Sequence, residues 1–215
     1  MPGKVPVSFL KLELANSIIH GIGVLFSIIA MPVLAIVASH HDDNFILAGA
    51  AVYGFSFLMV FTFSTLYHGF QQPMVKEVMK ILDHISIYFL IAGSYTPLIL
   101  SYFYNKQGII MLLILWSLAV CGIFFKIFFV NRFSRISVLI YFMMGWMLVW
   151  TGSAFFNAMP VRVVALILVG NFLYSLGLVF YLWRRWVYHH AYWHSLVLLA
   201  AICHYVAILM AVNDR

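Results

Sequence analysis

Long apolar runs divide the chain, and short polar stretches separate them. Seven runs reach about 20 residues, the length that an α-helix needs to cross the hydrocarbon core of a bilayer. Their approximate cores are 17–38, 45–68, 82–103, 108–129, 136–157, 162–183 and 191–212. The runs lack the alternation of polar and apolar positions that marks transmembrane β-strands of about 10 residues. The pattern therefore predicts seven transmembrane helices.

The composition agrees with a chain that lives in lipid. Hydrophobic residues make up 65% of the 215 positions and charged residues only 8%, which is typical of an integral membrane protein. The stretches between the runs are too short for a soluble domain. We therefore expect one all-α domain over residues 1–215, a seven-transmembrane helix bundle. The residues before position 17 lack a small-residue cleavage pattern, so the first run is expected to serve as an uncleaved insertion signal.

The basic residues predict an orientation. Of the 12 lysines and arginines, nine fall on one side of the predicted membrane, namely Lys4, Lys11, Lys76, Lys80, Lys126, Arg132, Arg135, Arg184 and Arg185. The other three are Lys106, Arg162 and Arg215. Because loops rich in basic residues stay in the cytosol, we expect a cytosolic N-terminus and a C-terminus outside. Basic loops also explain the net charge of +6, so no nucleic-acid partner is expected.

Five polar residues fall at one depth of this predicted bundle. Ser64 and His68 come near the cytosolic end of the second run, Asp83 opens the third, and His190 and His194 begin the seventh. Residues four apart occupy the same face of a helix. Two imidazoles at this spacing can bind one metal ion from a single helix. The pattern therefore predicts a metal site formed by His68, His190 and His194.

Three neutral imidazoles and one water form the arrangement of a catalytic zinc site. Zinc lowers the pKa of such a water to about 7, which produces a nucleophile for an amide or ester carbonyl. At the membrane interface, we expect that carbonyl to belong to a lipid. Asp83 suits the role of general base, and Ser64 can hydrogen-bond the water or orient an imidazole. Considered alone, each of these residues is also consistent with a structural role. In that role its side chain forms a hydrogen bond to a neighbouring helix or extends its polar end to the membrane surface. Other first-row ions also suit three imidazoles.

A polar stripe in the first run leaves two interpretations open. Glu13, Asn16 and His20 are spaced i, i+3 and i+7, so they line one face at the inner end of that helix. They can support the metal site through hydrogen bonds to the metal-binding histidines, or they can bind a lipid headgroup. Alternatively, Glu13 and Asn16 cap and anchor the start of a helix at the interface.

The other histidines near these runs are not expected to be ligands. His84 and His189 point about 100° away from the neighbouring site residues. His204 lies ten residues beyond His194, or about 15 Å of helix rise, so we expect a packing or gating role for it.

Two pairs of glycines repeat at a spacing of seven residues. They are Gly145 with Gly152, and Gly170 with Gly177. Small residues at such spacing let helices approach closely in membranes, so both pairs predict close helix packing.

Four segments resemble a known family. ELANSIIHGIG from Glu13, STLYHGF from Ser64, LDHISIYFLIAGSYTP from Leu82 and HAYWHS from His190 are similar to motifs of the hemolysin III branch of the progestin and adipoQ receptor family. The resemblance covers nearly the whole chain. It implies a seven-helix, multi-pass protein of the bacterial cytoplasmic (inner) membrane with a cytosol-facing N-terminus.

The same resemblance implies a site and a chemistry. Similarity to adiponectin receptors implies zinc held by His68, His190 and His194, with Asp83 and Ser64 near the bound water. Similarity to alkaline ceramidases implies hydrolysis of an amide in a lipid.

Three functions follow as hypotheses. The first is a zinc-dependent lipid hydrolase, or a protein of membrane lipid homeostasis, with membrane lipids as partners and no soluble protein partner. The alternative is a membrane sensor or receptor-like regulator in which zinc is structural. The branch name also suggests cytolysis by pore formation, which the sequence disfavours because no mobile amphipathic segment accompanies the long apolar runs.

Overall fold

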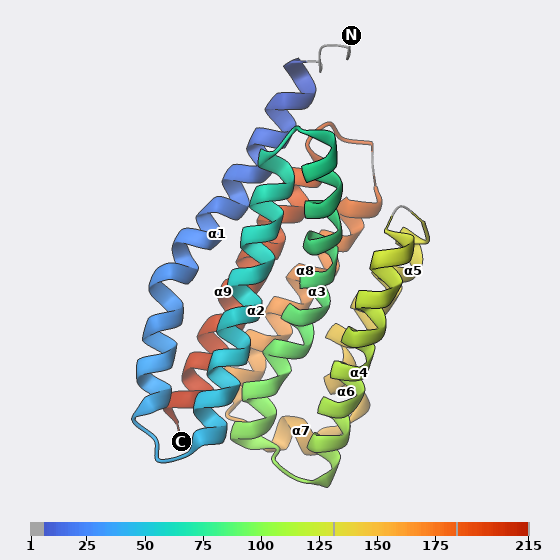
Figure 1. Ribbon diagram of the computed structural model, residues 1–215. Helices are drawn as coiled ribbons and strands as arrows, with labels where there is room; N and C mark the ends of the chain where they lie inside the picture. Colours follow the sequence, from blue (N-terminus) through green and yellow to red (C-terminus); the bar gives the residue numbers. More distant parts are fainter. Residues whose placement is uncertain (1–6, 131, 184, 215) are drawn as a thin grey trace.

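The computed structural model describes residues 7–130, 132–183 and 185–214, and in these residues it contains helices and no strands (Figure 1). Lys4, Arg184 and Arg215, which entered the charge count, lie outside the described residues. Among the described residues, six helices are long and apolar enough to cross a membrane. They are α1 (Val7–Ser39), α2 (Asn44–Gly69), α3 (Pro73–Tyr102), α4 (Lys106–Phe129), α8 (Val161–Leu182) and α9 (His189–Asn213).

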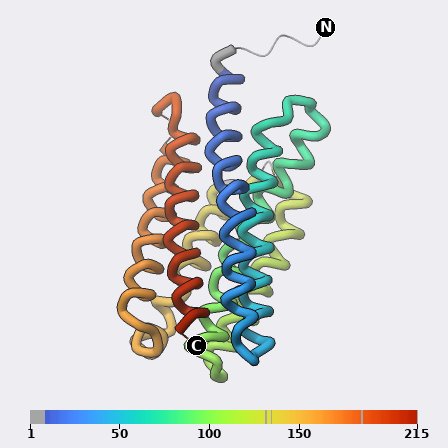
Figure 2. The backbone as a smooth tube through the Cα atoms, turned by 90° about the vertical axis from the view of Figure 1, so that its left-hand side faces the viewer, coloured from blue at the N-terminus to red at the C-terminus, as the bar shows by residue number. Residues whose placement is uncertain are grey.

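The helices form one elongated bundle, with the start of α1 and the end of α9 at opposite ends (Figure 1). Helix α9 contacts α1, α2, α3 and α8, and Figure 2 shows it between α1 and α8. The outer surface carries large apolar side chains, including Leu25, Ile29, Phe128 and Phe172, each more than 60% exposed. Such a surface is suited to lipid. The chain is therefore an integral membrane protein that crosses the bilayer several times.

Two helices begin earlier than the apolar pattern predicts. α1 begins at Val7 and not near residue 17, and α3 begins at Pro73 and not near residue 82. Proline suits the first position of a helix because its missing N–H would have no partner there. Asp83 therefore lies inside α3 and does not open it. Glu13 and Asn16 also lie inside a helix, so the interpretation in which they cap its start is wrong.

The predicted fifth helix, 136–157, is not continuous. Its residues form three short helices, α5 (Ser134–Gly145), α6 (Met147–Trp150) and α7 (Ser153–Asn157). They follow one another from one end of the bundle toward the other (Figure 1). Between α6 and α7, Gly152 adopts a φ of 67° and a ψ of −155°, a conformation open to glycine because it has no Cβ. A helix cannot continue through that conformation.

Side chains of α3 and α8 bind the backbone at the first break of this segment. The hydroxyl of Tyr95 donates to the carbonyl oxygen of Gly145 at 2.6 Å and accepts from the N–H of Leu148 at 3.2 Å. Asn171 Nδ2 donates to the same carbonyl at 3.1 Å. Non-helical backbone at membrane depth persists only where protein groups satisfy it. These partners explain why the stretch need not form one helix.

The two glycine pairs have different roles. A methyl group added at Gly170 would overlap the ring of His204, and one added at Gly177 would lie 2.7 Å from the ring of Trp193. Close packing is thus confirmed for this pair. A methyl group at Gly145 or Gly152 would meet no atom within 4 Å. The packing prediction is wrong for that pair, which lies at the breaks of the fifth segment.

We expect the substitution Gly170→Ala to destabilise the protein, because the added methyl group would overlap the buried ring of His204. Overpacking of this kind costs about 1–3 kcal/mol. The measurement is the midpoint of thermal unfolding in detergent. Gly145→Ala is the matched control, and its effect should stay within about 0.5 kcal/mol because the added methyl group meets open space. Equal losses in the two variants would contradict the contact between Gly170 and His204.

Candidate metal centre

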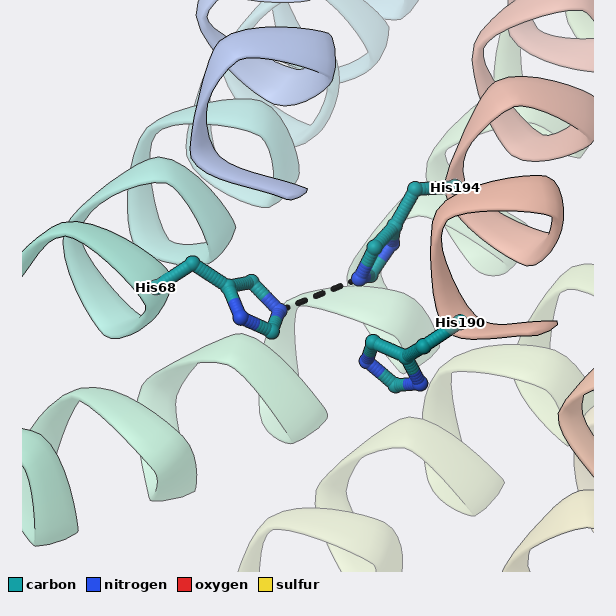
Figure 3. A group of neighbouring side chains, drawn as sticks. All are labelled: His68, His190 and His194. Carbon is teal, nitrogen blue, oxygen red and sulfur yellow. Dashed lines mark hydrogen bonds between the residues drawn. The ribbon is translucent and has the colours of Figure 1, made fainter. Parts of the chain in front are cut away.

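The antiparallel course of α2 and α9 brings three histidines to one end of the bundle. His68 lies in the last turn of α2, and His190 and His194 lie in the first two turns of α9. One ligand nitrogen from each lies within 4.8 Å of the others. Figure 3 shows the three rings turned toward one another, one from α2 and two from α9. We call these three residues the histidine cluster, and they can hold a metal ion.

The spacing of the donor atoms fits a tetrahedral ion. Nε2 of His194 lies 3.0 Å from Nε2 of His68. The ring of His190 has its centroid 4.4 Å from that of His194 and 5.3 Å from that of His68. Zinc binds imidazole nitrogen at about 2.0–2.1 Å, so two nitrogens on one tetrahedral zinc are about 3.4 Å apart. The separation of 3.0 Å is close to that value, and no two of the three ligand nitrogens are more than 4.8 Å apart.

Helix α1 supplies partners for the outer nitrogens of two of these rings. Nε2 of His20 shares a hydrogen bond with Nδ1 of His194. A carboxylate oxygen of Glu13 lies 3.4 Å from Nδ1 of His68, and Glu13 also forms an ion pair with Lys76. A group bound to the outer nitrogen fixes the tautomer and the orientation of a metal-binding imidazole. Nε2 of both rings faces the centre of the cluster. The hydrogen bond with His20 holds His194 in this orientation, whereas Nδ1 of His68 lies near the carboxylate of Glu13 but has no hydrogen-bond partner in the described part of the chain.

A cavity of about 410 Å³ joins the cluster to the other predicted site residues. Asn16, Ser64 and Asp83 line it together with the three histidines. Ser64 is 1% exposed, and its Oγ has no hydrogen-bond partner within the described part of the chain. The same holds for Oδ1 of Asn16, which is 3% exposed. The cavity therefore contains hydroxyl, amide and carboxylate groups with capacity to bind a ligand.

Three further cavity residues were not predicted from the sequence. His84 and His189 line the cavity although they stand outside the histidine cluster. His84 lies 3.8 Å from a carboxylate oxygen of Asp83, and its Nδ1 is 2.7 Å from the carbonyl oxygen of Lys80. Lys126, which the charge count placed on the cytosolic side, lies in α4 and is 1% exposed. The sequence did contain a signal for Lys126, because a charged residue close to the end of an apolar run commonly marks a functional site in a membrane protein.

His204 lies apart from the cluster, as predicted. It lines a second, largely apolar cavity of about 80 Å³. Its ring packs against that of Tyr174, with centroids 5.6 Å apart. The two cavities share wall residues, among them Val60, Tyr141 and Val197.

Comparisons with known proteins cover most of the chain. Residues 9–205 match the family described as "Haemolysin-III related". The chain is 41% identical over 189 residues to "Hemolysin-3 homolog" of Bacillus subtilis (strain 168), covering 88% of this chain and 89% of that protein. It is 43% identical over 190 residues to "Hemolysin-3" of Bacillus cereus, covering 88% and 87%. The human "Monocyte to macrophage differentiation factor" is 26% identical over 173 residues, 78% of this chain and 71% of that protein. No solved structure matches significantly.

Proposed function

Because the chain belongs to the haemolysin-III-related family, we propose that it is a zinc-binding membrane protein that hydrolyses an amide or ester bond of a lipid. The observation that carries this proposal is the histidine cluster, with Glu13 and His20 behind two of its rings. A site that only packed helices together would not need three imidazoles facing one point. Three neutral imidazoles with a fourth position open to water are the ligand set of a catalytic zinc site.

The proposal includes a topology. The six long helices and the broken segment α5–α7 together make seven crossings, with the N-terminus in the cytosol and the C-terminus outside. The end of the bundle that holds the histidine cluster also carries Lys76, Lys80 and the connection with Arg132. Basic residues at one end favour that end as the cytosolic one. Two of the relatives are bacterial, which supports the bacterial cytoplasmic membrane as the location.

The residues of the cavity have different roles in the proposed hydrolysis. His68, His190 and His194 would hold zinc, which when bound lowers the pKa of a coordinated water to about 7. Asp83 accepts a proton from the attacking water, and the hydroxyl of Ser64 orients that water by a hydrogen bond. The water oxygen bonds to the carbonyl carbon, and the bond to the amine or alcohol breaks. Asp83 then returns the proton to the leaving nitrogen or oxygen.

The second cavity supports a lipid as the substrate. It opens between α2, α3, α5, α8 and α9, and its walls are mostly apolar. Because it shares walls with the cavity of the histidine cluster, part of an acyl chain can lie there while a carbonyl group lies near the histidines. Burial of each methylene group contributes about 0.8 kcal/mol to binding.

The experiment that tests this function uses the wild-type protein in detergent. We expect about one zinc ion per chain by elemental analysis, and release of fatty acid from at least one lipid amide or ester. Treatment with a chelator should abolish the release, and added zinc should restore it. Zinc without hydrolysis of any lipid tested would contradict the hydrolase and leave a structural metal. Protein without any metal would contradict the zinc site itself.

We expect the substitution Glu13→Gln to weaken zinc binding by about 10–100-fold, the usual cost of losing a group that orients a metal-binding histidine. The neutral amide keeps the size of the side chain but loses the charge next to His68 and Lys76. Competition with a chelator of known affinity measures the change. Glu77→Gln on the exposed face of α3 is the matched control. Equal zinc affinities in both variants would exclude Glu13 from the support of the site.

A further inference from the structure

Lys126 is a lysine buried inside a membrane protein, and the chemistry described above does not use it. Its side chain is 1% exposed and lines the same cavity as the histidine cluster. Within the described part of the chain, no carboxylate lies within 4 Å of its ammonium group. A buried charge without a direct partner is costly in lipid and commonly marks a binding site.

The charges around Lys126 favour an anion. Lys80 and Asp83 of α3 act on it electrostatically, and both line the cavity. The two lysines and the single carboxylate leave an excess of one positive charge. Glu13, the other acid of the cavity, is already paired with Lys76. The side of the cavity formed by α3 and α4 is therefore positive, and the histidine cluster lies on the side of α2 and α9.

The depth of Lys126 fits a lipid headgroup. It lies three residues before the end of α4 at Phe129, or about 4.5 Å of helix rise. In the proposed topology, that position lies close to the level at which phosphate groups meet the hydrocarbon core. The cavity also reaches the surface, because its lining includes Phe9 and Val187, which are 40% and 71% exposed. A lipid headgroup can thus enter the cavity from the outer surface of the bundle.

We propose that Lys126 binds the phosphate of a lipid headgroup, so that the ligand of this cavity is an anionic phospholipid. A lysine ammonium is a compact charge with three donors, well suited to phosphate oxygens. Ser137 and Tyr141 of α5 bring hydroxyl groups to the same cavity. A glycerophospholipid carries its phosphate and its ester carbonyls on one glycerol, so one cavity can take both. This inference names the class of substrate for the proposed function. Only the cleavage of the lipid rests on that function, because binding of the phosphate by Lys126 needs no zinc.

The test is thermal unfolding in a neutral detergent with added short-chain ligands. Dioctanoyl phosphatidylglycerol should raise the midpoint of the wild type by several degrees, because a ligand that binds only the folded state stabilises it. Dioctanoylglycerol, which has the same chains and no phosphate, should give a much smaller shift. In Lys126→Met the two lipids should act equally. Lys126→Arg, which keeps the charge, and Lys106→Met, at the exposed opposite end of α4, should behave as the wild type does.

Each other outcome overturns the proposal. Equal shifts by the two lipids in the wild type would do so even if Lys126→Met failed to fold. An equal Lys126-dependent shift with inorganic phosphate would mean a site for small anions, and one with octanoate a site for carboxylates. A less stable Lys126→Met that keeps its response to phosphatidylglycerol would leave Lys126 as a counter-charge for Asp83.

The same series in the double variant His190→Ala/His194→Ala separates this inference from the proposed function. That variant is expected to lack zinc and to leave the lipid intact. A retained shift with phosphatidylglycerol would support the phosphate site whether or not the protein is a hydrolase. A shift lost in this variant but present in the wild type would show that the lipid is bound through the histidines and would overturn the role of Lys126.

Discussion

Replacing His190 and His194 by alanine is expected to reduce the zinc content of the purified protein from about one ion per chain to none. The two side chains supply two of the three nitrogens of the histidine cluster from a single helix, α9. His68 alone cannot hold the ion against a chelating buffer, because one imidazole contributes only a fraction of the binding free energy. Elemental analysis of the detergent-purified variant gives the result directly. Hydrolysis of any lipid substrate should disappear with the metal.

The control for this variant replaces His40 and His41 by alanine. These residues follow α1 at the end of the bundle opposite the histidine cluster. The control protein should keep its zinc, which shows that exposed histidines do not account for the metal. A folded His190→Ala/His194→Ala protein with the zinc content of the wild type would place the ion elsewhere and end the present assignment.

The substitution Asp83→Asn is expected to lower turnover by about 10²–10⁴-fold, the usual contribution of a general base, while zinc stays bound. An amide has nearly the shape of the carboxylate but does not accept a proton at neutral pH. The measurement pairs the rate of lipid hydrolysis with elemental analysis of the same sample. Asp42→Asn, in the exposed turn between α1 and α2, is the matched control.

Two results would change the role of Asp83. Retained activity in Asp83→Asn would remove this residue from the mechanism. Loss of zinc together with activity would make Asp83 a ligand of the ion and not a base.

The apolar pattern predicted the six long helices because each contains an apolar run long enough to cross the hydrocarbon core, and two of the six also begin at a local capping signal. The side chain of Asp43 caps α2 by accepting from the N–H of Phe45, and Asn105 caps α4 by accepting from that of Gly108. α1 and α3 extend beyond their apolar runs because their first turns carry polar residues, which a hydropathy window leaves out. Such a window measures the part of a helix that suits lipid, and a helix can be longer than that part.

The broken fifth segment could not be predicted in this way. Its run is mostly apolar, and nothing within it shows that Tyr95 and Asn171 will bind its backbone. Those partners lie about 50 and 26 positions away along the chain. The positive φ of Gly152 is equally invisible in a count of hydrophobic residues.

The histidine cluster was predictable because depth and helix face are both local properties. The i, i+4 spacing fixed the face of α9, and the end of each apolar run fixed the depth. Contacts that depend on how a helix is rotated against its neighbours were not predictable. The hydrogen bond of His20 with His194 and the burial of Lys126 are of this kind, because packing between helices sets that rotation.

The two hydrogen bonds to the carbonyl oxygen of Gly145 affect how the fifth segment inserts into the membrane during synthesis. This oxygen takes one hydrogen bond from α3, which is synthesised earlier, and one from α8, which is synthesised later. Until α8 leaves the ribosome, the fifth segment lacks part of the bonding that lets an irregular backbone rest in lipid. We therefore expect residues 134–157 to insert stably only together with α8, as a pair. In a membrane-insertion assay, chains truncated before Val161 should leave this segment exposed to protease or glycosylation, and chains extended through Leu182 should protect it.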